Sequence, residues 1–305
     1  MLKLHEKSKK LVSSICQKNL LHKIFLERTL QDFSVEEMRN LEHLISFYES
    51  LGNTIEHIAE KYLNLIYYIM KDEIYFYKNN KYRYSCYRET EHIYSNKSIM
   101  DYYLIGAGLS TYFWPAHRKI LHFFLKYLNS LQLITRGGGY FEVAPGHGEY
   151  MKTAMENTSF NCYEAVDISP TSVDITKKYL EYSIKGNKNY SVEKMDFFDY
   201  RGDKSFDAIV MGEVLEHVEN PLMFLRKIHE NSTDDTKIFI TTAINSPQPD
   251  HIYLFRNLDE VRDMLKLANF EIIEECYTMN KEISIELAEK KRETMDVGYI
   301  LKTKS

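Results

Sequence analysis

The sequence predicts an α/β protein of two parts: a mainly helical N-terminal unit and a doubly wound unit on a seven-stranded, mostly parallel sheet. Two observations support this prediction. Before the triple glycine at 137–139, apolar residues recur mainly at helical spacing. After it, short β-prone runs alternate with segments of helical length, which is the pattern of βαβ units. We therefore expect units at 1–136 and 137–305.

Local signals divide the first unit into helices. Ser34 and Glu37 have the spacing of a capping box, and a helical apolar pattern follows them. The tyrosine-rich stretch 74–87 favours a hairpin that turns at its two adjacent asparagines, although a helix-loop-helix also fits. Pro115 marks the start of a further helix, whose apolar residues line one face.

Seven strand-like runs define the second unit. The predicted strands are 140–144, 162–166, 190–195, 206–211, 237–242, 270–277 and 295–302. The first five are separated by helical segments, so they should be parallel. The last two are joined by a loop and a short helical stretch, and we expect them to close one edge as an antiparallel pair.

The composition limits the classes of function. With 44% hydrophobic and 27% charged residues, the chain reads as a soluble globular protein. It has no apolar run of membrane-spanning length and no signal peptide, and four scattered cysteines argue against a disulfide framework or a zinc site. We therefore expect a cytoplasmic protein without a membrane partner. The net charge of −5 argues against nucleic-acid binding.

The charge is divided unevenly between the two units. Residues 1–139 carry +5 and residues 140–305 carry −10. Docking of two oppositely charged units explains this division, and recruitment of an acidic substrate by the basic unit is the alternative.

The stretch FEVAPGHGEY, residues 141–150, places two glycines one residue apart directly after a strand-like run. In a doubly wound sheet, ligands bind beyond the carboxyl ends of the strands. Side chains at Gly146 and Gly148 would collide with a cofactor lying across this turn, and amides of the next helix would face its polar groups. The turn alone is a weak signal, because an ordinary strand-to-helix turn gives the same pattern.

The end of the second strand supplies a carboxylate for a ribose. Asp167 lies 21 residues after Gly146, where nucleotide-binding folds place an acceptor for the two hydroxyls. An aspartate after a strand often caps the next helix instead, but Ser169 or Thr171 can serve that purpose here. Ile168 could cover one face of a base.

The third and fourth strands add further candidates. Asp196 can accept a hydrogen bond from an exocyclic amine, and Phe197 can pack against a purine. Gly212 and Glu213 fall at the carboxyl edge of the fourth strand. A nicotinamide cofactor is the alternative ligand, but its motif needs a third glycine where this chain has Met151.

Taken in order, FEVAPGHG, AVDIS, MDFFD and FDAIVMGEVLEHVENP resemble the class I S-adenosylmethionine-dependent methyltransferases. E-V-L-E-H-V is common in their ubiquinone-biosynthesis-like branch. The resemblance covers about residues 140–278 and implies a Rossmann-like methyltransferase fold with S-adenosyl-L-methionine as cofactor. The family usually opens with acidic-x-Gly-x-Gly-x-Gly. Ala144 replaces the first glycine here, so the turn should be slightly wider.

The resemblance also implies a role for each site residue. Glu142 would orient the amino group of the cofactor, and the glycine turn would pass under its methionine portion. Asp167 would hold the ribose, and Asp196 with Phe197 would frame the adenine. The predicted cofactor-binding residues are Glu142, Ala144, Gly146, Gly148, Asp167, Ile168, Asp196, Phe197, Gly212 and Glu213.

Two histidines are candidate catalytic residues. Methyl transfer from a sulfonium requires an aligned nucleophile and often the removal of one proton, which histidine can accept near neutral pH. His217 follows the fourth strand and His251 lies on the loop after the fifth. Each could instead orient its loop, and a neutral amine nucleophile would need no base. No cluster of metal ligands is evident, so we expect no metal.

Aromatic residues just before the second unit are candidates for substrate binding. They are Tyr102, Tyr103, Tyr112, Trp114 and His117. These residues could fold over the open edge of the sheet as a lid, which would exclude water from the reaction. Aromatic residues at helical spacing are also typical of a hydrophobic core.

These observations predict a methyltransferase that acts on an oxygen or nitrogen of a small biosynthetic metabolite. The helical unit would bind the substrate or form a homodimer. Two alternatives are a methyltransferase for protein or tRNA and a non-catalytic cofactor-binding protein that regulates a partner. A long basic groove in the first 139 residues would favour the macromolecular substrate, but the charges there are dispersed.

Overall fold

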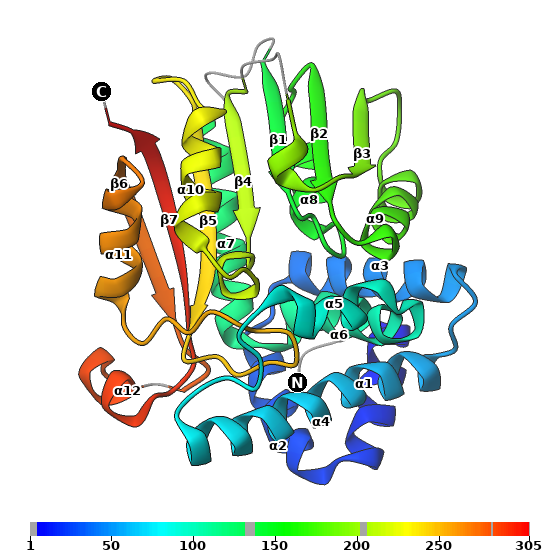
Figure 1. Cartoon of the computed structure of the whole chain (residues 1–305). Helices are drawn as coiled ribbons and strands as arrows, with labels where there is room; N and C mark the ends of the chain where they lie inside the picture. The colour runs from blue at the N-terminus through cyan, green and yellow to red at the C-terminus, as the bar shows by residue number, and fades with distance from the viewer. Residues whose placement is uncertain (1–4, 132–137, 202–205, 282, 305) are drawn as a thin grey trace.

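The computed structural model describes residues 5–131, 138–201, 206–281 and 283–304. Its N-terminal part is helical and lies across one edge of a central sheet, beneath the sheet in the view of Figure 1. The helices of this part are α1 (Glu6–Lys18), α2 (Leu20–Thr29), α3 (Val35–Ser50), α4 (Ile55–Asn79), α5 (Tyr87–Ser95) and α6 (Lys97–Phe113). The fold class predicted from the sequence is confirmed.

Helix boundaries in the N-terminal part follow local chemistry. The capping box before α3 is confirmed, because Ser34 and Glu37 each accept a hydrogen bond from the other's backbone amide. The predicted hairpin at 74–87 is wrong, and the helix-loop-helix alternative is correct. Helix α4 continues to Asn79, and Asn80 ends it in the left-handed conformation at φ 54°. Asparagine tolerates this conformation and commonly ends helices in this way.

The central sheet has seven strands in the order β3-β2-β1-β4-β5-β7-β6. The strands are β1 (Gly139–Val143), β2 (Cys162–Asp167), β3 (Tyr190–Lys194), β4 (Ala208–Gly212), β5 (Lys237–Ile244), β6 (Phe270–Thr278) and β7 (Met295–Thr303). The first five are parallel, and β7 is antiparallel to both β5 and β6. Both the strand count and the antiparallel pair at the edge are confirmed.

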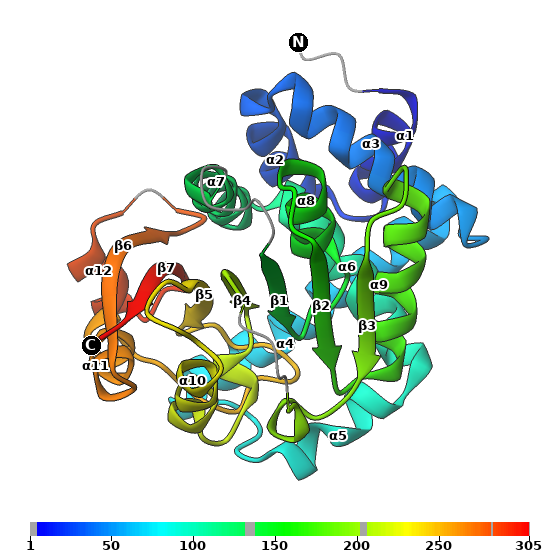
Figure 2. The same ribbon diagram turned by 90° about the horizontal axis from the view of Figure 1, so that it is seen from above.

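Helices cover both faces of the sheet. Figure 2 shows α7 (Pro115–Leu131) and α8 (Glu149–Asn157) on one side, with α10 (Pro221–Glu230) and α11 (Leu258–Leu267) on the other. Helix α9 (Pro170–Ser183) packs with α8, and α12 (Ile285–Lys291) connects β6 to β7. Because successive strand residues point to opposite faces, neighbours enter different cores. Tyr140 joins the cluster under α7 and α8, whereas Phe141 joins the cluster under α10 and α11.

Helix α7 packs against the sheet, although it precedes the predicted boundary between the two units. Its Phe124 ring lies 5.0 Å from the ring of Phe239 on β5, and the Tyr127 hydroxyl donates to the carbonyl of Lys237 at 2.9 Å. The predicted boundary between residues 136 and 137 falls outside the described residues. The helix start expected at Pro115 is confirmed, and only Trp114 separates α7 from α6.

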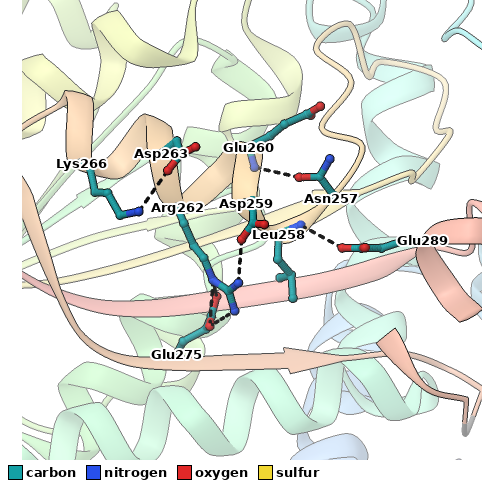
Figure 3. Close-up of polar contacts among 9 residues, drawn as sticks. All are labelled: Asn257, Leu258, Asp259, Glu260, Arg262, Asp263, Lys266, Glu275 and Glu289. Atoms are coloured by element: carbon teal, nitrogen blue, oxygen red, sulfur yellow. Dashed lines mark hydrogen bonds and ion pairs between the residues drawn. The ribbon is translucent and has the colours of Figure 1, made fainter. Parts of the chain in front are cut away.

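Polar contacts fasten α11 to the outermost strand. Figure 3 shows the Arg262 guanidinium between Glu275 of β6 and Asp259 of its own helix, with N–O distances of 2.6 and 2.9 Å. Asn257 caps the helix by accepting from the amide of Glu260. These contacts hold the antiparallel edge at the end of the sheet remote from the glycine turn.

Candidate active site

The chain turns sharply after β1. Ala144, Gly146 and Gly148 all have positive φ angles, of 55°, 56° and 87°. A Cβ at Gly146 would meet no protein atom within 4 Å, so the space beside its Cα is open. Gly148 differs from our expectation, because a Cβ there would approach Thr176 of α9 to 3.2 Å. That glycine makes room for the packing of α8 against α9.

Ala144 occupies the position where the family usually has its first glycine. Its amide donates to the carbonyl of Val166 at 2.8 Å, which ties the turn to β2. The left-handed conformation costs an L-residue other than glycine roughly 1–2 kcal/mol. The chain therefore keeps the glycine-type turn at Ala144 and carries this strain.

Asp167 ends β2 next to the glycine turn. Its carboxylate accepts from the amides of Gly146 at 3.3 Å and Ser169 at 2.8 Å, and the side chain is buried. Burial raises the pKa of Asp167 to about 6, although both amide hydrogen bonds act in the opposite direction. Ser169 caps α9 by accepting from the Ser172 amide, as the sequence predicts, so Asp167 is not needed as the cap.

Glu142 is the second acidic residue beside the turn. It is 1% exposed, and the Tyr140 hydroxyl donates to its Oε2 at 2.5 Å. Burial raises the pKa of Glu142 to about 8, and the neighbouring Asp167 adds to this shift. A cationic group next to Glu142 would favour its charged form.

The ends of β3 and β4 complete this edge of the sheet. Asp196 accepts from the amide of Phe198 at 2.9 Å and caps a short 3₁₀ turn that contains Phe197. Gly212 is glycine for a packing reason, because a Cβ there would collide with the Tyr150 ring. Burial, together with the neighbouring Glu216 and Asp296, raises the pKa of Glu213 well above its usual range.

A cavity of about 520 Å³ lies between the carboxyl edge of the sheet and helices α5 to α7. Its volume is within the range of roughly 300–1,000 Å³ typical of ligand pockets. The predicted site residues that line it are Glu142, Ala144, Gly146, Asp167, Ile168, Asp196, Phe197, Gly212, Glu213, His217, His251, Tyr103, Trp114 and His117. The structure therefore brings together residues from all of the predicted motifs.

Three predicted residues do not line this cavity: Gly148, Tyr102 and Tyr112. The Tyr112 side chain is fully buried, and its hydroxyl donates to Glu149 at 2.8 Å, so it belongs to the core. The Tyr102 ring stacks on Tyr68 of α4 with the ring centres 5.5 Å apart. Both positions match the alternative reading of these aromatics as packing residues.

Trp114 and His117 lie at the joint between α6 and α7. The indole Nε1 of Trp114 donates to the Tyr62 hydroxyl at 3.1 Å, and their contact links the cavity wall to α4. His117 Nδ1 lies 3.0 Å from Ser110 Oγ. Burial lowers the pKa of His117 to about 4, so its ring is neutral at pH 7.

His217 lies in a buried polar network that the sequence did not reveal. Its Nδ1 is 3.2 Å from Asp250 Oδ2. Asp250 also accepts from the hydroxyls of Tyr94 on α5 and Tyr103 on α6, at 3.0 and 3.3 Å. Burial alone would lower the pKa of His217, but the charge of Asp250 and the hydrogen bond to it raise this pKa to about 9.

Glu216 and His251 are the neighbours of His217. The ring centre of His251 lies 4.6 Å from that of His217, and Glu216 Oε1 lies 3.9 Å from His217 Nε2. Burial and the charge of His217 lower the pKa of His251 to about 3. Sequence reasoning missed Asp250 and Tyr94. The only local signal for Asp250 was its position directly before the candidate His251.

The fold and the cavity define a Rossmann-like methyltransferase. Its features are the 3-2-1-4-5-7-6 strand order, the bare glycine turn after β1 and the carboxylate that ends β2. Among the helices of the described residues, none has both the length and the apolar character that a membrane crossing requires.

The comparison with protein families agrees with this class. A family model described as a methyltransferase domain matches residues 116–275, which is more than half of the chain. The chain therefore belongs to the methyltransferase domain family. It is an S-adenosylmethionine-dependent enzyme of that family. A search of curated proteins found no match.

Solved structures with a similar fold include three enzymes of low sequence identity. The cyclopropane synthase MmaA2 from Mycobacterium tuberculosis matches at a TM-score of 0.47 with 11% identity, covering 60% of this chain and 84% of its own. The N-methyltransferase NodS from Bradyrhizobium japonicum, solved with S-adenosylhomocysteine, matches at a TM-score of 0.45 with 12% identity. The match covers 61% of this chain and 87% of NodS. The 1,6-didemethyltoxoflavin-N1-methyltransferase from Burkholderia thailandensis matches at a TM-score of 0.45 with 15% identity. The match covers 63% of this chain and 79% of that enzyme.

The residues of this chain fit the cofactor. The bare backbone at Gly146 leaves space for a ligand against the turn, and Asp167 and Glu142 present carboxylates to the same cavity. A ribose needs a hydrogen-bond acceptor and an ammonium group needs a negative charge, and these two side chains would supply them to a bound cofactor.

Proposed function

We propose that this methyltransferase acts on an oxygen or nitrogen of a small biosynthetic metabolite. One observation carries this proposal: the helices α5 to α7 form part of the wall of the cavity that the predicted cofactor residues also line. A concave and largely apolar pocket suits a small acceptor better than a protein or an RNA. The E-V-L-E-H-V stretch at 213–218 supports placing the chain in the ubiquinone-biosynthesis-like branch.

S-adenosylmethionine, when bound, supplies an activated methyl group. Asp167 would accept from its ribose hydroxyls, and Glu142 would hold its amino group. Ile168 is 41% exposed at the cavity and Phe197 is buried beside it, so they would flank the adenine. The chain would then align an acceptor with the methyl group and exclude water from the reaction.

The helical part would provide the acceptor pocket. Tyr103, Trp114 and His117 contribute to the cavity from α6 and α7, and His217 and His251 face it from the loops after β4 and β5. An acceptor that contacts both groups would touch both parts of the chain. We also propose a cytoplasmic location. A homodimer formed through the helical part remains a prediction.

Labelling of cell extracts tests this function. The purified protein is incubated with methyl-labelled S-adenosylmethionine and with separate metabolite, RNA and protein fractions of an extract. We expect label in the metabolite fraction. Label only in RNA or protein would contradict the small-molecule assignment.

A matched pair of variants tests whether the labelling depends on the cavity. Asp167→Ala removes the proposed ribose acceptor, and Asp174→Ala removes an exposed aspartate paired with Lys178 on α9. We expect the first variant to lose transfer and the second to retain it. Equal loss in both variants would show that the label does not report on this site.

A further inference from the structure

Three side chains that could ligate a metal meet on the wall of the cavity. Glu216 and His217 lie in the short 3₁₀ turn η3 (Leu215–His217) after β4, and His251 lies on the loop after β5. One ligand atom from each of the three lies within 4.8 Å of the others. We name this group the Glu-His-His cluster.

Two buried polar atoms of the cluster lack a hydrogen-bond partner among the described residues. Glu216 is fully buried, and its Oε2 accepts from Thr242 Oγ1 at 2.7 Å, but its Oε1 has no hydrogen-bond partner among the described residues. His251 is 2% exposed, and its Nδ1 has no partner there either. A buried polar atom left without a hydrogen bond destabilises the fold, so such atoms call for a specific explanation.

A second layer of residues orients His217. Its Nδ1 lies against Asp250, which leaves Nε2 on the side of Glu216, 3.9 Å from Oε1. A carboxylate bonded to one ring nitrogen while the other faces an ion is the usual support of a metal-bound histidine. Tyr94 and Tyr103 donate to Asp250 in turn, so this layer reaches into the helical part of the chain.

From this geometry we propose that Glu216, His217 and His251 bind a divalent first-row transition-metal cation. A dyad of Asp250 and His217 without an ion would explain their own contact but not the two unpaired buried atoms. Two imidazoles and one carboxylate suit Mn²⁺, Fe²⁺, Co²⁺ or Zn²⁺ better than Mg²⁺ or Ca²⁺, which prefer oxygen ligands. The cation would occupy the position of the His217 Nε2 proton.

The spacing is compatible with such an ion. Ligand atoms about 2.1 Å from one ion lie at most about 4.2 Å apart, so small side-chain rotations suffice. Sequence reasoning predicted no metal because the ligands come from two loops distant in the chain. On this proposal the two histidines bind a cation in place of accepting a proton.

The site also suggests the chemical class of the acceptor, and this step rests on the proposed function. Three protein ligands leave positions of a transition-metal ion open toward the cavity. An oxygen donor of the acceptor, such as a hydroxyl, would fill one of them, and the positive charge would lower the pKa of that hydroxyl. Oxygen is therefore favoured over nitrogen as the methylated atom.

Titration with Co²⁺ alone tests the site without any assay of activity. Metal-free protein should bind one Co²⁺ per chain and show the visible absorption of imidazole-bound cobalt. His217→Gln and His251→Gln should each weaken binding at least tenfold, and Asp250→Asn should weaken it about 10- to 100-fold. The control His57→Gln changes an exposed histidine on α4 and should bind as the wild type does. Cobalt binding that survives both cluster substitutions together would overturn the proposal.

Two further measurements are needed. The first tests the cation site even if the variants fail to fold, and the second distinguishes the cation site from the proposed methyltransferase function. Crystals of wild-type protein soaked in Mn²⁺ should show an anomalous peak among the three ligands, and a peak elsewhere or none would refute the site. Methyl transfer at full rate after exhaustive chelation would remove the cation from the reaction but leave the proposed function standing. A bound cation without methyl transfer to any small molecule would confirm the cation site and contradict the proposed function.

Discussion

At the scale of single residues, Ala144 shows how the chain departs from a family pattern without changing the backbone. Its φ of 55° is one that glycine adopts without strain. Ala144→Gly should therefore stabilise the protein by about 0.5–1 kcal/mol, since relief of strain exceeds the entropy gained by the unfolded chain. Urea unfolding monitored by circular dichroism measures this change. A destabilised variant would show that the alanine methyl makes a packing contribution.

Asp167 provides the direct test of the ribose site. Asp167→Ala should weaken binding of S-adenosylhomocysteine by at least about 10- to 150-fold, because the loss of even one hydrogen bond to a charged acceptor costs about 1.5–3 kcal/mol. Isothermal titration calorimetry measures the dissociation constant. Asp174→Ala, on the exposed side of α9, should leave it unchanged. An unaltered constant in the Asp167 variant would place the ribose elsewhere.

Glu142 predicts a pH dependence of cofactor binding. With its pKa raised to about 8 by burial, Glu142 is mostly protonated at pH 7 in the ligand-free protein. The ammonium group of the cofactor favours the carboxylate, so affinity should rise roughly eightfold between pH 7 and 8.5. Calorimetry in buffers of different ionisation enthalpy should detect proton release at pH 7.

The control for this prediction is Glu142→Gln, which should bind more weakly and lose the pH dependence. As pH rises, the contribution of Glu142 to the stability of the ligand-free protein falls, whereas its contribution to cofactor binding increases. Because the folded pKa lies above its ordinary 4.5, this group favours the ligand-free fold below pH 4.5 and loses that contribution as pH rises through about 8. Binding without proton release at pH 7 would contradict the assignment.

At the scale of elements, α5 is held to the sheet edge by one hydroxyl in particular. The Tyr94 hydroxyl donates to Asp250 and lies 3.1 Å from His217 Nδ1. Tyr94→Phe should reduce the free energy of unfolding by about 1–3 kcal/mol, because it leaves a buried carboxylate with one donor fewer. Denaturant unfolding measures the loss. Tyr182→Phe, on the half-exposed face of α9, should change it by less than about 0.5 kcal/mol.

The elements also show what the sequence could predict. Strand positions followed from alternation between apolar runs and helical segments, and the site residues after β1 and β2 followed from their places at strand ends. The second half of α4 was harder to predict, because its tyrosines suit a strand as well as a helix. Asn80 ended the helix where we expected a turn between strands.

At the scale of the whole molecule, long-range contacts limited the prediction. Tyr94, His217 and Asp250 come from α5 and from two loops, and nothing local in the sequence places them side by side. Their meeting depends on how the helical part lies on the sheet. The glycine turn and Asp167, in contrast, follow from a single βαβ unit, so the sequence was sufficient to find them.

The shared cavity predicts that a ligand stabilises both parts together. At a concentration 100 times its dissociation constant, S-adenosylhomocysteine should raise the free energy of unfolding by about 2.7 kcal/mol. Hydrogen exchange should then slow in α5 and α6 as well as at the ends of β1, β2 and β4, since all of these border the cavity. Slower exchange in the sheet alone would show that the helices do not enclose the ligand.

The position of α7 determines where the chain can be cut. A fragment that begins at residue 138 would strip this helix from the sheet and expose Phe239 and its apolar neighbours to water. A fragment that begins at Pro115 would keep that surface covered. Attempts to express the catalytic portion alone should therefore yield aggregates from the shorter version and dispersed protein from the longer one.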